Sequence, residues 1–393
     1  MPIHHHIFRN DPRRLPTGDG IQSVPAFSRF ILTAGIAVLL GACGSVGSRQ
    51  IKSERTNYNL AVQETEDSQL LLNLVRLKYH DTPVFLELTG ITSQSTFESG
   101  LSNGDPIAEI AQPPSLIWKP GPNLTFSAQP TVSYMPLHGE KFAQQLLAPI
   151  KIESLMLLYR SGWSLQNILQ LCVQRLNKIE NAVHASGPTP ETAPRYEDFA
   201  SIVSSLVKLK HSGHLDFVYE AFPTPKDATR IVLHVSPTAF HLRHVQDLLK
   251  RLNLAPGKEH YPVTYSLVEH GGSAELDHLE VETRSLQGLL YFLSQAVEVP
   301  DKDVKDGLVT VTRTADGGTF DWAKATQGLL RVRSSATRPP KASTKVQYRG
   351  SWFYIADSDL VSKSTFSLVT QLVSLQSGDS ARLTPVLTLP VSR

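Results

Sequence analysis

The segment KVQYRGSWFYIA at residues 345–356, followed by DLVSKSTFSLVTQLVSLQ at residues 359–376, decides the fold class of this chain. The first part is dense in aromatic residues and favours a strand. The second part has apolar residues at the spacing of one helix face, and Asp357 or Ser358 can cap it. A strand followed directly by a long helix predicts a fold in which both kinds of element share one core.

The same alternation extends toward the N-terminus, but without the regular strand–helix–strand repeat of a doubly wound sheet. We therefore predict a mixed α+β fold in two packed segments. The predicted helices are 56–79, 139–150, 154–158, 164–179, 196–210, 238–252, 286–296 and 359–376. The predicted strands are 84–91, 124–134, 215–220, 230–235, 263–268, 309–314, 328–333, 345–356 and 383–389.

Composition excludes several classes of protein. The chain has 393 residues, of which 41% are hydrophobic and 19% charged, so it can bury a large core and is not a disordered chain. Two cysteines are too few for a disulfide framework. The formal net charge of +2 argues against a nucleic-acid partner.

Basic residues and a short apolar run mark the N-terminus. Arg9, Arg13, Arg14 and Arg29 precede an uncharged run at residues 30–42. That run is shorter than the roughly 20 residues that cross a bilayer as a helix, but it has the length of the apolar region of a signal peptide. We predict a signal peptide at residues 1–42, because small residues follow the run.

The sequence Leu40-Gly41-Ala42-Cys43 resembles the lipobox of bacterial lipoproteins. The resemblance implies that Leu40, Gly41 and Ala42 are recognised by the signal peptidase, and that the Cys43 thiol carries a diacylglyceryl group. It also implies cleavage before Cys43 and acylation of the new amino terminus. Two or more acyl chains give stable attachment, so the expected partner is a membrane and the only expected added group is covalent lipid, with no cofactor. A secretory leader cut elsewhere, or a buried segment with a chance cysteine, is the alternative.

The residue after Cys43 bears on location. In lipoproteins an aspartate at this position favours the inner membrane, and here it is Gly44. The resemblance therefore implies an outer-membrane protein that faces the periplasm. The leader carries four arginines and two aspartates, so its removal takes away the whole net charge of +2.

The remaining chain divides at a proline-rich stretch. Residues 43–55 are rich in Gly, Ser and charged residues and predict a tether. Residues 185–195 carry three prolines and predict a linker. The expected domains are an N-terminal α+β domain at 56–184 and a C-terminal α+β domain at 196–393.

The search for catalytic chemistry gives weak candidates. The chain has no G-x-S-x-G, H-E-x-x-H, C-x-x-C or P-loop motif. His241 and His244 lie three residues apart on a predicted helix and could share a zinc ion, but the sequence designates no third ligand. We expect a solvated histidine face and no metal. The acidic run at 275–282 around His278 is expected to be a solvated strand edge.

Two segments could form an interaction surface. Trp352 and Tyr354 lie in the aromatic strand, and Arg76 and Tyr79 end the helix predicted at 56–79. Trp, Tyr and Arg dominate binding hot spots, so these residues are candidates for contact with a partner. Packing in the core is the alternative for both segments.

The same segments resemble a group of uncharacterised proteobacterial envelope lipoproteins. The resemblance rests on residues 69–83, 134–139, 283–288 and 348–390, and it implies no established activity. We expect a non-catalytic binding or assembly component of the cell envelope, with an envelope protein as partner. One alternative is an envelope hydrolase, which could depend on a metal. Another is a small-ligand or peptidoglycan-binding module, so enzymatic activity stays open.

Overall fold

The computed structural model describes residues 58–102, 107–109, 115–117, 121–137, 139–220, 230–265, 275–326, 328–377 and 387–390. The chain divides into one unit of residues 1–63 and a second of residues 64–393. The lipobox at 40–43 and the tether at 43–55 lie outside the described residues. The elements below belong to the second unit, which is α+β as predicted.

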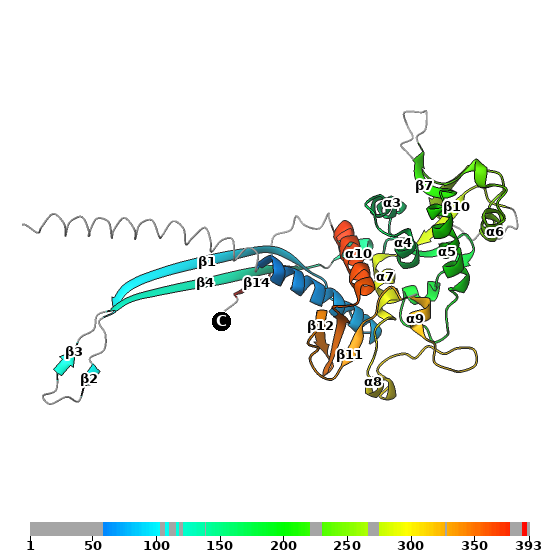
Figure 1. Cartoon of the computed structure of the whole chain (residues 1–393). Helices are drawn as coiled ribbons and strands as arrows, with labels where there is room; N and C mark the ends of the chain where they lie inside the picture. Colours follow the sequence, from blue (N-terminus) through cyan, green and yellow to red (C-terminus); the bar gives the residue numbers. More distant parts are fainter. Residues whose placement is uncertain are drawn as a thin grey trace, which may run out of the picture. The chain divides into compact units, whose positions relative to one another are not determined.

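The sheet with the most strands among the described residues is a six-stranded mixed sheet, of which Figure 1 labels β7 and β10. Its strand order is β6-β5-β10-β9-β8-β7. Strands β9 and β10 are parallel, and the other neighbours are antiparallel. The strands are β5 (Val173–Leu176), β6 (Ile179–Glu180), β7 (Leu215–Glu220), β8 (Arg230–Val235), β9 (His260–Tyr265) and β10 (Leu279–Thr283).

Short amphipathic helices pack around this sheet because each carries one apolar stripe that must be buried. Helices α3 and α4 place Ile152, Leu155 and Ile168 against Phe217 and Ile231 of the sheet. The helices are α3 (Ile152–Arg160), α4 (Leu165–Cys172), α5 (Glu197–His211), α6 (Arg243–Arg251) and α7 (Leu286–Ser294). Two short 3-10 helices, η1 (Val183–Ser186) and η2 (Pro237–Ala239), lie in the connections.

A second, three-stranded sheet has the order β11-β13-β12. Its hairpin turns at Arg349 and Gly350, whose φ values of 48° and 82° fit the two-residue turn that matches strand twist. The elements of this part are α8 (Asp301–Lys305), α9 (Trp322–Ala325), β11 (Arg333–Ser335), β12 (Ala342–Tyr348), β13 (Ser351–Ala356) and α10 (Leu360–Ser377). The helix at residues 58–78, whose C-terminal part lies in this unit, and α2 (Glu140–Leu147) complete the helical elements.

The third sheet is a long hairpin with a short added strand. β1 (Leu86–Ser102) pairs with β4 (Gly121–Pro136) along its whole length, and β14 (Leu387–Pro390) pairs with the other edge of β4 (Figure 1). The register shifts between Leu88 and Gly90, so Thr89 is an extra residue in β1. Between the two long strands, β2 (Ile107–Glu109) pairs with β3 (Ser115–Ile117).

One hydrophobic core runs through the described elements of the second unit. It includes Leu74 and Leu171 before residues 185–195, and Leu206 and Phe353 after them. The six-stranded sheet also takes β5 and β6 from before this stretch and β7 to β10 from after it. The structure thus differs from the predicted division at 185–195, because strands on both sides of the prolines hydrogen-bond in one sheet.

Several predicted elements differ in the structure. Residues 309–314, predicted to be a strand, form only isolated bridges at Arg313, and β11 begins at Arg333, the last residue of the strand predicted at 328–333. The helix predicted at 164–179 ends at Cys172, and β5 follows at once. The strand predicted at 345–356 is two strands, because Arg349 and Gly350 turn the chain. The strands predicted at 215–220 and 230–235 are confirmed with the same bounds.

Arg284 explains why α4 stops where it does. Its side chain is fully buried, and its Nη1 donates to the carbonyl oxygens of Gln170 at 3.3 Å, Leu171 at 3.0 Å and Val173 at 3.0 Å. Nη2 donates to the Asn181 carbonyl oxygen. A cation is favourable at the C-terminus of a helix, where carbonyl oxygens lack helical partners. Arg284 therefore satisfies the end of α4 from a distant part of the sequence.

The remaining contacts of Arg284 hold it in place. Nε donates to Ser186 Oγ at 3.1 Å, and the guanidinium lies 4.0 Å from the centre of the Phe292 ring. All five groups that accept from it are neutral. Burial lowers the pKa of Arg284 to about 9, so the guanidinium stays protonated at neutral pH.

We predict that Arg284→Met lowers the free energy of unfolding by about 3 kcal/mol or more, because several buried carbonyl oxygens lose a donor at roughly 1–3 kcal/mol each. Denaturant unfolding measures this. Arg331→Met is the matched control, since Arg331 makes an exposed ion pair with Glu298 at 2.6 Å that is worth less than about 1 kcal/mol. Equal losses in the two variants would contradict the role given to Arg284.

Candidate functional site

The end of the helix at 58–78 meets the β12–β13 hairpin in a cluster of aromatic and charged side chains. The Tyr79 hydroxyl donates to Asp303 at 2.5 Å, and the Tyr348 hydroxyl donates to Asp81 at 2.5 Å. The two tyrosine rings are 5.8 Å apart, edge to face. Arg349 pairs with Asp81 at 2.9 Å and lies over both rings.

The electrostatics of this cluster favour a locked structural contact. Burial and the hydrogen bond to Asp303 raise the pKa of Tyr79. The hydrogen bond from Tyr348 and the Arg349 charge lower the pKa of Asp81. The tyrosines therefore stay protonated donors and the aspartate an ionised acceptor, so the cluster fastens the helix to the hairpin.

A buried lysine extends the same cluster. Lys78 Nζ donates to Gln295 Oε1 at 3.1 Å, and the Thr189 hydroxyl donates to the same oxygen at 3.1 Å. Burial lowers the pKa of Lys78 to about 8. Because this pKa lies below the ordinary value of 10.5, the contribution of Lys78 to stability increases as pH rises from about 8 toward 10.5.

The structure does not bring the four candidate residues of the interaction surface together. Tyr79 is 5% exposed and contacts Phe353, with ring centres 6.2 Å apart, on the core side of β13. Trp352 and Tyr354 alternate with the buried Phe353 and Ile355, so they lie on the opposite face of the strand. Arg76 is half-buried on the helix at 58–78.

The outer face of the second sheet keeps the character of a binding surface. We call it the aromatic–basic face, and it is made of Trp352 and Tyr354 of β13 with their cross-strand neighbours Arg333, Ser335, Lys345 and Gln347. The Arg338 guanidinium lies 5.7 Å from the centre of the Trp352 ring. None of these residues is acidic, so the face suits a partner with apolar and negatively charged groups. The register between β11, β12 and β13 determines which residues belong to this face. A single strand predicted at 345–356 has no cross-strand neighbours and therefore could not identify them.

The histidine candidates are dispersed. His241 and His244 are exposed at the start of α6, and the His244 ring lies 5.8 Å from that of His214. His234 and His260 form a second ring pair at 5.0 Å, where His260 is 3.2 Å from Glu220. Within the described ranges, no group of three or more His, Cys, Asp or Glu side chains is placed to hold a metal ion.

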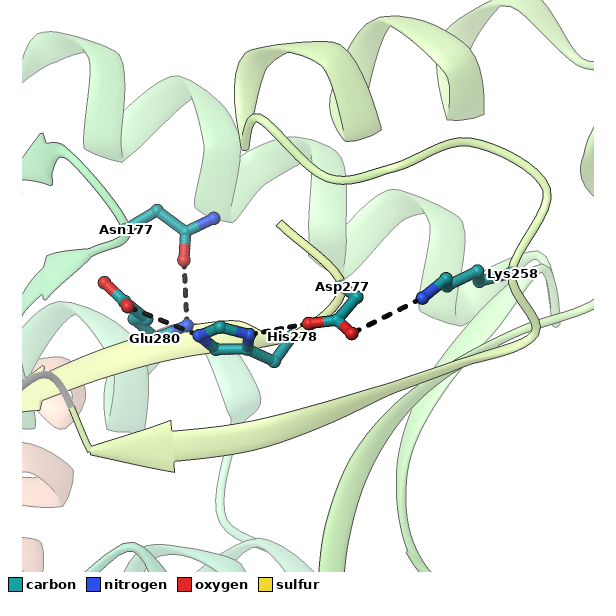
Figure 2. Close-up of polar contacts among 5 residues, drawn as sticks. All are labelled: Asn177, Lys258, Asp277, His278 and Glu280. Carbon is teal, nitrogen blue, oxygen red and sulfur yellow. Dashed lines mark hydrogen bonds and ion pairs between the residues drawn. The ribbon is translucent and has the colours of Figure 1, made fainter. Parts of the chain in front are cut away.

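His278 forms a separate polar network at the start of β10 (Figure 2). Its Nδ1 is 2.9 Å from Asp277 Oδ1 and its Nε2 is 3.3 Å from Glu280 Oε1. Asp277 also pairs with Lys258 at 3.6 Å, and Asn177 Oδ1 accepts from the backbone of Glu280 at 2.8 Å. The acidic run was expected to be a solvated edge, but β10 is an inner strand and Glu280 is 7% exposed.

This arrangement limits what His278 can do. The hydrogen bond to Asp277 and the nearby Glu280 raise the pKa of His278 above its ordinary value of 6.5. Both imidazole nitrogens face a carboxylate, Asp277 at Nδ1 and Glu280 at Nε2, so neither nitrogen is directed toward an open site. The network therefore joins β10 to Asn177 and to Lys258 and does not form a catalytic base.

We predict that His278→Gln destabilises the protein by about 0.5–1 kcal/mol at pH 5.5 and by less at pH 8.5. A raised folded pKa gives stability that is fully present below the unfolded value of 6.5 and is lost as pH rises through the folded pKa. Denaturant unfolding of both proteins across this pH range measures the effect. The exposed His241 provides the control variant His241→Gln, and a loss that grows with pH would contradict the network.

A cavity of about 240 Å³ lies at the base of the long hairpin. Its apolar lining comes from Phe85, Leu86 and Leu88, and its polar lining includes Asn73. The Asn73 amide is already bonded to the backbone of Val84, at 2.9 Å and 2.8 Å. The cavity has a mixed lining, because Glu66, Gln69, Thr370 and Ser374 also contribute to it.

Comparison of the chain with protein-family models, curated proteins and solved structures finds no match. Within the described part of the chain, no helix has both the length and the apolar character needed to cross a membrane.

Proposed function

We propose that this chain is a lipid-anchored component of the bacterial envelope that acts by binding other molecules. The Leu40-Gly41-Ala42-Cys43 sequence, with its basic flank and 13-residue apolar run, supports anchoring through Cys43. Gly44 supports the outer membrane, with the protein facing the periplasm. The expected group on the chain is covalent lipid.

An open sheet edge is the observation that carries the binding role. β1 has 17 residues and is an edge strand, with β4 as its partner among the described strands. Such an edge presents a row of backbone donors and acceptors that pair readily with another strand, and proteins usually keep edges short or cover them. A long edge strand therefore supports a role in assembly.

The aromatic–basic face supports a second contact. Trp352, Tyr354 and Arg338 are residue types that dominate hot spots, and they lie on one side of a rigid sheet. A partner bound there would be held close to the membrane by the proposed anchor. The two surfaces together favour an assembly component over an envelope hydrolase.

Acylation tests the anchor directly. We expect cells fed an alkyne-bearing palmitate analogue to incorporate the label into the wild-type chain, because the Cys43 thiol forms a thioether and the new amino terminus is acylated. Cys43→Ala should lose the label and accumulate the uncleaved chain. Cys172→Ala is the matched control, since Cys172 is fully buried. Label that persists in Cys43→Ala would contradict the proposal.

Photocrosslinking tests the binding role. A photoreactive residue at the exposed Gln347 should crosslink in cells to a reproducible envelope protein, and Trp352→Ala should reduce the yield about tenfold because it removes a hot-spot side chain. The same residue at the exposed Ser201 of α5 is the control. No product at Gln347, together with stoichiometric zinc in the purified protein, would favour the hydrolase.

A further inference from the structure

The β1–β4 hairpin separates polar from apolar positions between its two faces. Successive residues of a strand lie on opposite faces, and the register states which positions of the two strands share a face. One face, called here the apolar face, is made of six cross-strand pairs: Ile91–Val132, Ser93–Pro130, Ser95–Ala128, Phe97–Phe126, Ser99–Leu124 and Leu101–Pro122. Every pair has at least one apolar residue, and none has a charge.

The opposite face has a different composition. It is made of the pairs Thr92–Thr131, Gln94–Gln129, Thr96–Ser127, Glu98–Thr125 and Gly100–Asn123. It contains no aliphatic or aromatic residue. A strand pair with water on both sides needs no such separation, so the apolar face is built to meet an apolar environment.

The added strand β14 follows the same rule. Leu387 and Leu389 pair with Tyr134 and Val132, and Thr388 pairs with Ser133. The leucines thus continue the apolar face, whereas Thr388 and Pro390, which pairs with Thr131, lie on the polar one. Three strands from two distant parts of the sequence agree on which face is apolar.

The length of the apolar face matches a lipid bilayer. It spans 11 residues on each strand, from Ile91 to Leu101 and from Pro122 to Val132. A strand tilted by about 45° needs roughly 9–11 residues to cross the hydrocarbon core. Ordinary strands have about 5–6 residues, so packing on a small domain does not require this length.

We propose that this hairpin inserts into a lipid bilayer with its apolar face toward the acyl chains, and that copies of the chain join edge to edge, with β1 of one copy beside β4 of the next, beyond the four residues of β4 that pair with β14. Unpaired backbone groups are too costly in hydrocarbon, so the edge strands of neighbouring copies pair until the sheet closes on itself. The polar face, with Glu98, then lines a water-filled interior. This inference deepens the proposed function, because it names the membrane and further copies as the partners in assembly.

Cysteine scanning tests the insertion, because the native chain supplies little background. Cys43 carries lipid under the proposed function, and Cys172 is fully buried with a pKa raised to about 12 by burial. Single cysteines replace Leu124, Phe126 and Ala128 on the apolar face, and Asn123, Thr125 and Ser127 on the polar face. The full-length chains are reconstituted in vesicles of phosphatidylethanolamine and phosphatidylglycerol and treated with a charged maleimide.

We expect the labelling to alternate along the strand. The cysteines at 124, 126 and 128 should react at less than about a tenth of the rate of those at 123, 125 and 127, because hydrocarbon excludes both the thiolate and the charged reagent. All six should react equally after denaturation in urea. Equal labelling at all six positions in vesicles places the hairpin in water, and equal protection buries it in protein, and either result overturns the proposal.

Ion leakage tests the closed assembly. Vesicles with the wild-type chain should release trapped ions, and Phe126→Arg should abolish the leak because it puts a charge on the apolar face. Ser127→Arg, the matched change one residue away on the polar face, should keep the leak and alter its ion preference. Alternating protection without any leak would overturn the assembly of copies.

Two controls separate this result from the anchor and from misfolding. Unchanged thermal unfolding of the purified variants excludes a folding defect. The palmitate label reports the anchor independently of the hairpin. Alternating protection in a chain without label contradicts the anchor alone, and label without alternation contradicts the insertion alone.

Discussion

The buried guanidinium of Arg284 is the interaction on which the rest of the unit at 64–393 depends. It takes the carbonyl oxygens at the end of α4, holds the 3-10 helix η1 through Ser186, and stacks on Phe292 of α7. Its own backbone bonds both Cys172 and Ile150. A charge in this place is tolerated because all three guanidinium nitrogens donate to oxygens, and the helix end supplies the negative field.

This arrangement explains which elements the sequence could predict. β7 and β8 were predictable from local signals, because β7 alternates in polarity along most of its length and β8 is a short run of apolar residues, with Ile231, Val232 and Leu233 all buried. The helix predicted at 164–179 was wrong beyond Cys172, because the residue that ends it lies 113 positions from Leu171. The only local sign of this contact in the sequence is that an arginine stands directly before Ser285, which caps the apolar helix α7. The prolines at 185–195 favour a turn, but a turn does not determine which of the strands before and after it pair in a sheet.

The candidate sites divide in the same way. Tyr79 and Trp352 were sound choices of residue type, but burial turns the first into a packing group and strand alternation leaves the second on the outer face. The cluster around Tyr79 also contains Asp81, Asp303 and Arg349. These residues come from three separate segments, so no short sequence motif indicates that they meet. His278 looked like part of an exposed acidic run, whereas pairing with β5 and β9 makes its strand internal. In each case cross-strand register decides, and register is a property of the folded sheet.

The extra residue at Thr89 has a consequence for how the long hairpin can change. Before Thr89 in the chain, Leu86 and Leu88 line the cavity, and after it Ile91 is the first residue of the apolar face. A strand without the extra residue would place Ile91 on the other side from Leu88. The extra residue shifts the alternation of β1 by one position, so that Ile91 lies on the same face as Leu88. Residues 86–88 can then pack at the cavity while residues 91–101 form the apolar face. Deletion of Thr89 would therefore move residues 91–102 of β1 to the opposite face relative to β4, without changing the core of the unit at 64–393.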